Sequence, residues 1–163
     1  MKRMFLIAAA LFAVTPAHAD LTPLPAQYFC QTHPDQCRGG GADTIVLTDA
    51  ALRTLQTVNR RVNRAIRPQR DAADVWALAP AAGDCEDYAL TKRAMLIEAG
   101  WPPNALRLAI GQRRGEAHAI LIVQTDRGIL ALDNLRAAIT TLADNGLIVT
   151  ALSSGDLAKW SAK

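Results

Sequence analysis

The sequence predicts an α+β fold in which a cysteine-bearing central helix packs on an antiparallel sheet. Two segments, 48–67 and 84–99, carry apolar residues at helical spacing. Three strand-like runs follow at 106–110, 118–124 and 129–133, and a turn signal joins the last two. Two runs joined in this way form an antiparallel hairpin, so we expect the second helix to be the buried centre of one domain.

The N-terminus has the pattern of a secretory signal peptide. Lys2 and Arg3 precede an apolar run over 4–14, and small residues at 17–19 mark a cleavage site. The run is too short to span a bilayer, and no later segment approaches the required length. We expect residues 1–19 to be removed and the mature protein to be soluble in a bacterial periplasm, with no stable membrane insertion.

Cleavage would also change the charge of the chain. The whole sequence carries +3, and Lys2 and Arg3 leave without any acidic residue, so the mature chain carries +1. This balance gives no support for nucleic-acid binding. The remaining length, about 140 residues, is enough for one well-buried domain and too short for two. We assign that domain to 48–163.

The segment before it, 20–47, is rich in Pro, Gly and polar residues and predicts a mostly irregular lead-in. Cys30 and Cys37 bracket a short loop within it, which favours a disulfide in an oxidising compartment. That pairing would leave Cys85 as a free thiol. The alternative is that Cys85 pairs with one of the other two and leaves an unpaired cysteine near the N-terminus.

The first predicted helix starts near Thr48 and ends before Pro68, because the residue that precedes a proline is pushed out of the helical region. Its polar face is basic, with Arg53, Arg60, Arg64 and Arg67. An acidic partner or lipid headgroups could bind there, but a solvated face explains the pattern equally well, and we assign it no function.

Residues 69–82 read as a loop, in which Trp76 is expected to fill the core and is a candidate wall of a cleft. The second predicted helix, 84–99, begins at a lone thiol within an acidic cluster, Asp84, Cys85, Glu86 and Asp87. Acidic residues suit the positive end of a helix, and Gly100 ends it. Near the C-terminus, the run 147–152 predicts an edge strand and Trp160 a cover for the core.

Three residues have the chemistry of a nucleophilic triad. Cys85 at a helix start is a candidate nucleophile, because a helix N-terminus and a nearby imidazolium both favour the thiolate. His118 opens one hairpin strand and Asp133 closes the next, so a turn near 125–126 would set them opposite each other, with Cβ atoms about 5 Å apart. Each residue alone has an ordinary structural explanation, but together they indicate acyl-transfer chemistry.

The carboxylates around the thiol favour a cation. Asp84, Glu86 and Asp87 would raise the pKa of Cys85, and a hard cation would relieve that. Three closely spaced carboxylates are plausible calcium ligands, although simple helix capping explains them equally well. The chain lacks the CxxC and HExxH spacings of zinc sites.

Three motifs occur in order along the chain: 83–89 (GDCEDYA, followed by Lys92-Arg93), 117–119 (AHA) and 132–135 (LDNL). Together they resemble the bacterial transglutaminase-like cysteine proteinases, above all the LapG-type periplasmic proteases. The resemblance implies a papain/transglutaminase-like fold and a catalytic triad of Cys85, His118 and Asp133.

In the LapG-type branch, acidic residues around the nucleophile bind calcium, so the resemblance implies a calcium site at Asp84, Glu86 and Asp87. These proteases cleave a large surface adhesin and are restrained by an inner-membrane receptor for cyclic di-GMP. The expected partners are therefore a protein or peptide substrate and an inner-membrane regulatory receptor. Two other functions stay open: a protein acyltransferase of the transglutaminase type on the same triad, and a non-catalytic periplasmic binding module.

Overall fold

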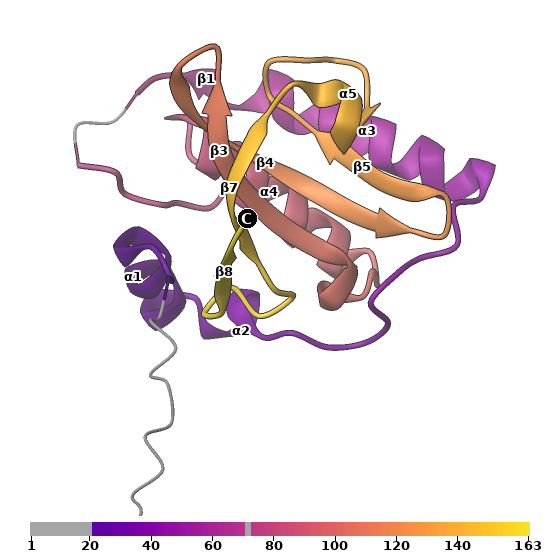
Figure 1. Cartoon of the computed structure of the whole chain (residues 1–163), viewed down its shortest axis with the longest axis horizontal. Helices are drawn as coiled ribbons and strands as arrows, with labels where there is room; N and C mark the ends of the chain where they lie inside the picture. The colour runs from indigo at the N-terminus through magenta and orange to yellow at the C-terminus, as the bar shows by residue number, and fades with distance from the viewer. Residues whose placement is uncertain (1–20, 71–72) are drawn as a thin grey trace, which may run out of the picture.

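A computed structural model describes residues 21–70 and 73–163 (Figure 1). The predicted signal peptide, 1–19, lies outside these residues. The described helices are α1 Leu24–Thr32, α2 Pro34–Cys37, α3 Asp49–Ala65, α4 Cys85–Glu98, the 3-10 turn η1 Pro103–Ala105, and α5 Leu142–Asn145. The described strands are β1 Arg67–Pro68, β2 Ala82–Gly83, β3 Leu106–Arg113, β4 Glu116–Thr125, β5 Gly128–Leu132, β6 Thr140–Thr141, β7 Ile148–Ser153 and β8 Trp160–Ala162.

Six of these strands form one antiparallel sheet in the order β6-β5-β4-β3-β7-β8. Helix α4 packs on β4 and β3, and α3 packs against α4, so both long helices cover one face of the sheet (Figure 1). The short strands β1 and β2 pair in parallel beside the start of α4. The α+β class and the central position of the cysteine-bearing helix are therefore confirmed.

The main core lies between the sheet and the two helices. Strand residues Leu108 and Leu121 and helix residues Leu55 and Leu96 are fully buried there. A smaller apolar cluster, built around Ile120 and Ile122, covers the opposite face of the sheet. Because side chains alternate along a strand, β4 contributes to both clusters.

The two long helices match their predicted segments closely. Thr48 caps α3, its hydroxyl accepting the backbone N–H of Ala51 at 3.1 Å. The helix ends at Ala65, shortly before Pro68, as the proline rule requires. Tyr88 joins α4 to this end of α3, because its hydroxyl donates to the Ile66 carbonyl at 2.7 Å.

One local prediction was wrong and another was incomplete. The lead-in is irregular over 38–47, but it also contains α1 and α2, and both helices carry a proline in their first turn. Proline is tolerated there because its missing N–H has no helical partner. Strand β7 is not an edge strand, because β8 pairs with its outer side.

The disulfide joins Cys30 in α1 to Cys37 in α2, and Cys85 is the free thiol of the described chain. Trp76 is buried in the core and packs against Trp160, with ring centroids 6.1 Å apart. None of the described helices has the length and apolar content of a bilayer-spanning segment.

Candidate active site

Cys85 is the first residue of α4. The chain enters the helix through Asp84, whose backbone N–H donates to Asp87 Oδ2 at 3.2 Å, half of a capping box. Gly83 allows this close approach, since a Cβ atom at that position would lie 2.1 Å from the same oxygen. The local sequence therefore presents the thiol at the positive end of a buried helix.

The thiol opens into a cleft of about 730 Å³. His118 and Ala119 of β4, Asn134 and Leu135 after β5, and Trp76 from the loop before β2 also line it. The backbone N–H of Ala119 interacts with the Cys85 sulfur and partly offsets the rise in its pKa. Cys85 and His118 therefore meet in one cleft, although 33 positions separate their numbers in the sequence.

His118 and Asp133 form a buried pair, with Nε2 and Oδ1 separated by 3.0 Å. Their register differs from the prediction. Thr125 pairs with Gly128, so the turn is centred one residue later than expected, and continuing the register would set Ile120, not His118, opposite Asp133. His118 is the diagonal neighbour on the same face, which the two side chains can span.

The Asp133 carboxylate receives further donors. Its Oδ1 accepts the Leu135 backbone N–H at 2.9 Å, and its Oδ2 accepts Asn145 Nδ2 at 3.1 Å and the Arg113 guanidinium. Burial alone would raise the pKa of Asp133, but the hydrogen bonds from His118, Leu135 and Asn145 outweigh it and hold that pKa well below its ordinary value. The carboxylate is ionised at neutral pH.

Arg113 and Asn145 were missed by the sequence prediction. Arg113 ends β3, and α5 carries Asn145 to Asp133. Thr141 and Gly146 are recognisable start and stop signals for α5, since Thr141 caps it and Gly146 has a φ of 83°. These signals predict a short helix but not which buried group its last residue faces.

The Cys85 thiol lies in an acidic setting. Burial, followed by the charge of Glu86 and the hydrogen bond to it, raises the pKa of Cys85 to about 12. The thiol donates to Glu86 Oε2 at 3.2 Å. Burial and a hydrogen bond with Asp84 in turn raise the pKa of Glu86 to about 8. Two carboxyl groups therefore crowd together beside the sulfur.

Of the three predicted calcium ligands, the structure brings Asp84 and Glu86 together. Asp84 Oδ1 is buried and has no hydrogen-bond partner among the described residues. Asp87 has other contacts, because its Oδ1 accepts the Ala77 backbone N–H at 2.7 Å and its Oδ2 accepts that of Asp84. Within 21–70 and 73–163, no cluster of three or more His, Cys, Asp or Glu side chains is placed to hold a metal.

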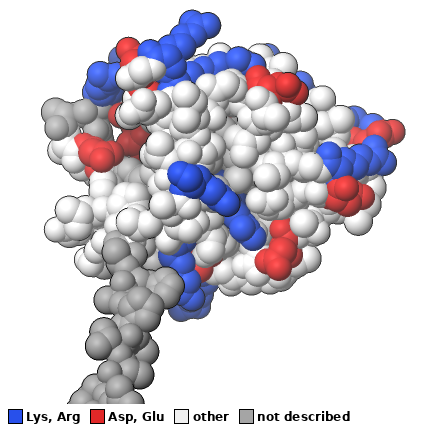
Figure 2. All heavy atoms as spheres, in the orientation of Figure 1, with Lys and Arg blue, Asp and Glu red and all other residues white. Residues whose placement is uncertain are grey.

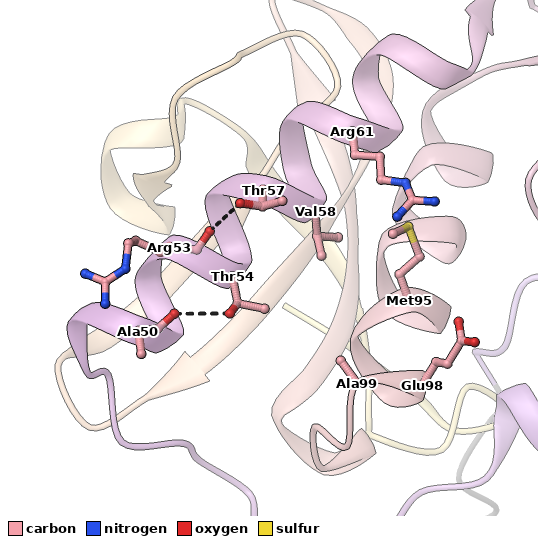
Figure 3. A pocket seen from close by; sticks show the side chains of 9 residues that line it. All are labelled: Ala50, Arg53, Thr54, Thr57, Val58, Arg61, Met95, Glu98 and Ala99. Carbon is pink, nitrogen blue, oxygen red and sulfur yellow. Dashed lines mark hydrogen bonds between the residues drawn. The ribbon is translucent and has the colours of Figure 1, made fainter.

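A separate groove of about 620 Å³ lies between α3 and α4 (Figure 3). Arg61 reaches over Met95 there, while Arg53 points away, and neither cysteine nor histidine is among its lining residues. On the face shown in Figure 2, basic and acidic side chains are interspersed with uncharged surface. This groove therefore lacks the thiol and imidazole that the cleft at Cys85 provides.

Comparisons with known proteins point to the same chemistry. Residues 17–162 match the family model of the bacterial transglutaminase-like cysteine proteinases, BTLCP. No curated protein matches the chain significantly.

Solved structures of Legionella pneumophila LapG share the fold. The EGTA-treated form is 25% identical over 61% of each chain, with a TM-score of 0.55. The calcium-bound form is 21% identical over 78% of this chain and 81% of its own, with a TM-score of 0.57. Because the family model spans nearly the whole described chain, this protein belongs to the bacterial transglutaminase-like cysteine proteinases.

Proposed function

We propose that the protein is a periplasmic cysteine endopeptidase that cleaves a protein substrate with Cys85, His118 and Asp133. The observation that carries the proposal is the meeting of a free thiol at a helix N-terminus with a buried imidazole–carboxylate pair in one cleft. Family membership supports the same chemistry. The surface adhesin and the inner-membrane receptor that the resemblance implies remain predictions.

We infer the role of each ring nitrogen from the hydrogen bond that the structure shows. Because Nε2 of His118 is bound to Asp133, Nδ1 is the nitrogen that we expect to act on the sulfur. It accepts the thiol proton, and the sulfur attacks the substrate carbonyl. The imidazolium then protonates the leaving amine as the C–N bond breaks, which leaves a thioester. Water, deprotonated by His118, releases the acid product and restores the thiol.

The tetrahedral intermediate places negative charge on the former carbonyl oxygen. Backbone N–H groups in the first turn of α4 have no partner within the helix and suit this charge. The N–H of Cys85 itself is one of these groups, because Cys85 is the first residue of α4. Asp133 keeps the imidazole oriented and stabilises its charged form, since its own carboxylate is held ionised.

Calcium fits beside the nucleophile. Asp84 and Glu86 offer clustered oxygen donors, one of them an unpaired buried oxygen, and backbone carbonyls or water would complete the shell. When bound, the ion supplies positive charge that offsets the two carboxylates and lowers the pKa of Cys85. We assign no ligand role to Asp87, because the backbone of Ala77 and Asp84 already uses its oxygens.

Alkylation of Cys85 tests the proposal. Iodoacetamide labelling of mature protein, read by intact mass from pH 5 to 10, should be at least about tenfold faster with calcium than with chelator near pH 7. His118→Ala should remove the fast phase, and Glu86→Gln should abolish the response to calcium. Slow labelling of wild type under every condition would refute the enzyme assignment. Incorporation of a labelled amine into protein, in place of hydrolysis, would indicate an acyltransferase.

A further inference from the structure

An apolar pocket of about 640 Å³ lies beside the cleft. Helix α1 supplies one wall through Leu24, Tyr28 and Phe29, and the loop before β2 supplies the other through Val75 and Trp76. Its size is in the range of pockets that enclose a small molecule or one large side chain.

The pocket walls carry apolar side chains that stay exposed to solvent in the folded protein. Leu24, Tyr28 and Val75 are 67%, 66% and 60% exposed, although each is large. Helix α1 contains no charged residue, and the surface over it in Figure 2 is uncharged where it is visible. Single exposed apolar side chains are ordinary, but several of them together commonly mark a binding site.

This surface belongs to a firmly held helix. Phe29 is buried in the main core, and the disulfide ties α1 to α2. At the start of α1, Gln27 Nε2 donates to the Thr22 carbonyl at 2.9 Å, and Thr22 Oγ1 donates to the Ala158 carbonyl at 2.8 Å. The exposed face of α1 is therefore held in place before any ligand binds, so binding would not have to order it.

The pocket shares lining residues with the candidate active-site cleft. Asp74 and Trp76 line both, and Pro23, which caps α1, lines the cleft. Because the two hollows share this wall, we infer that an extended chain bound at the Cys85 sulfur can place a neighbouring side chain in the pocket.

We propose that this pocket is a specificity subsite that takes a large apolar side chain, such as Leu or Phe, of the polypeptide substrate. The inference rests on the proposed peptidase function and adds the chemical class that the protease selects beside its scissile bond. Tyr28 and Val75 are the proposed specificity residues, since both line the pocket from opposite walls and both side chains are largely exposed.

Peptidyl vinyl sulfones test the subsite. Each probe is a tetrapeptide with alanine next to the reactive group, and one of its other positions carries Leu, Phe, Ser or Asp. The rate at which each probe labels Cys85 is divided by the rate at which iodoacetamide labels the same protein. At one position, Leu or Phe should label Cys85 at least tenfold faster than Asp. The double variant Tyr28→Ser/Val75→Ser should lose most of this preference, and the matched control Val46→Ser, 69% exposed outside the pocket, should keep it.

The same peptides as amides, titrated into Cys85→Ala protein and followed by tryptophan fluorescence, provide a readout that does not need the thiol. Equal binding of Leu and Asp peptides, or a preference that survives the double variant, would overturn the subsite. Self-association of wild type that the double variant removes, with no peptide preference, would assign the surface to a second copy instead. If Cys85 is unreactive but the protein still binds Leu peptides selectively, the peptidase proposal is refuted and the apolar subsite is supported.

Discussion

At the scale of single residues, Asp133 is the most constrained group of the candidate site. Asp133 is 1% exposed. Besides His118, its two oxygens accept the side chains of Arg113 and Asn145 and one backbone N–H. A buried carboxylate with this many donors is fixed in orientation as well as in charge. Orientation matters for the proposed mechanism, because the carboxylate binds one imidazole nitrogen and leaves the other for the Cys85 sulfur.

The low pKa of Asp133 predicts how stability depends on pH. Since the pKa of the folded state lies below the ordinary value of 3.8, ionised Asp133 stabilises the fold above about pH 4, and this contribution is lost as pH falls further. Asp133→Asn should therefore lower the free energy of unfolding by about 1–3 kcal/mol at pH 7. Urea titrations should show a constant deficit from pH 7 to 5 that narrows below pH 4. A deficit independent of pH down to 3 would contradict the assignment.

Asn145 should act through Asp133. Asn145→Ala removes one donor to the buried carboxylate, and Asn145→Asp places a second carboxylate against it. We expect the Asp variant to lose more activity than the Ala variant, by about tenfold or more, because like charges in contact oppose ionisation. Fluorogenic peptide hydrolysis against pH measures this, with Asp144→Asn, an exposed neighbour, as the control. Equal losses in both variants would mean that Asn145 only packs.

At the scale of elements, the site depends on how β3 meets its neighbours. Gly111 pairs directly with His118 across the sheet, and the register of β3 with β7 shifts between Ile110 and Gly111. The backbone of Ile148 comes so close that a Cβ atom at Gly111 would lie 2.0 Å from its carbonyl oxygen. This irregularity lies on the strand that supports the catalytic histidine proposed above.

Gly111→Ala should therefore disturb both the sheet and the site. The methyl group must displace β7, so we expect a loss of about 1–3 kcal/mol in the free energy of unfolding, together with slower Cys85 labelling. Gln112→Ala, at the exposed neighbouring position, should change neither by a measurable amount. Thermal unfolding and the labelling rate of both variants check this. A wild-type melting temperature for Gly111→Ala would show that β7 yields freely.

At the scale of the whole molecule, Arg93 joins segments that are far apart in sequence. This residue of α4 is 1% exposed, and its guanidinium donates to the carbonyls of Gln36, Leu106 and Gly155. It thereby holds the lead-in helix α2, the start of β3 and the loop before β8 to the central helix. A buried charge is tolerated here because three backbone acceptors surround it.

Arg93→Lys should show how much the assembly depends on this contact. The lysine ammonium group cannot reach all three carbonyl acceptors, so at least one buried carbonyl loses its hydrogen-bond donor. Each such loss should lower the free energy of unfolding by about 1–3 kcal/mol. Limited proteolysis should then cut the lead-in sooner than in wild type. Arg64→Lys, on the exposed face of α3, is the matched control. Unchanged stability and unchanged proteolysis in Arg93→Lys would contradict this role.

The amino-acid sequence by itself determined the two long helices, the central hairpin and the three residues proposed as the triad. Helical spacing, a capping residue and a turn signal act over a few neighbouring positions, so one chain segment is enough to recognise them. The same local information places Cys85 at a helix start and Cys30 close to Cys37.

Only the tertiary structure decided the diagonal register of His118 and Asp133, the donors Arg113 and Asn145, and the backbone groups whose N–H bonds Asp87 accepts. It also decided that α1 forms a helix whose apolar face lines the pocket beside the cleft. Each of these depends on contacts between segments distant in the sequence, and their geometry follows from how the layers pack. The local sequence pattern carries no information about that packing. The neighbours of the candidate site could therefore be identified only from the tertiary structure.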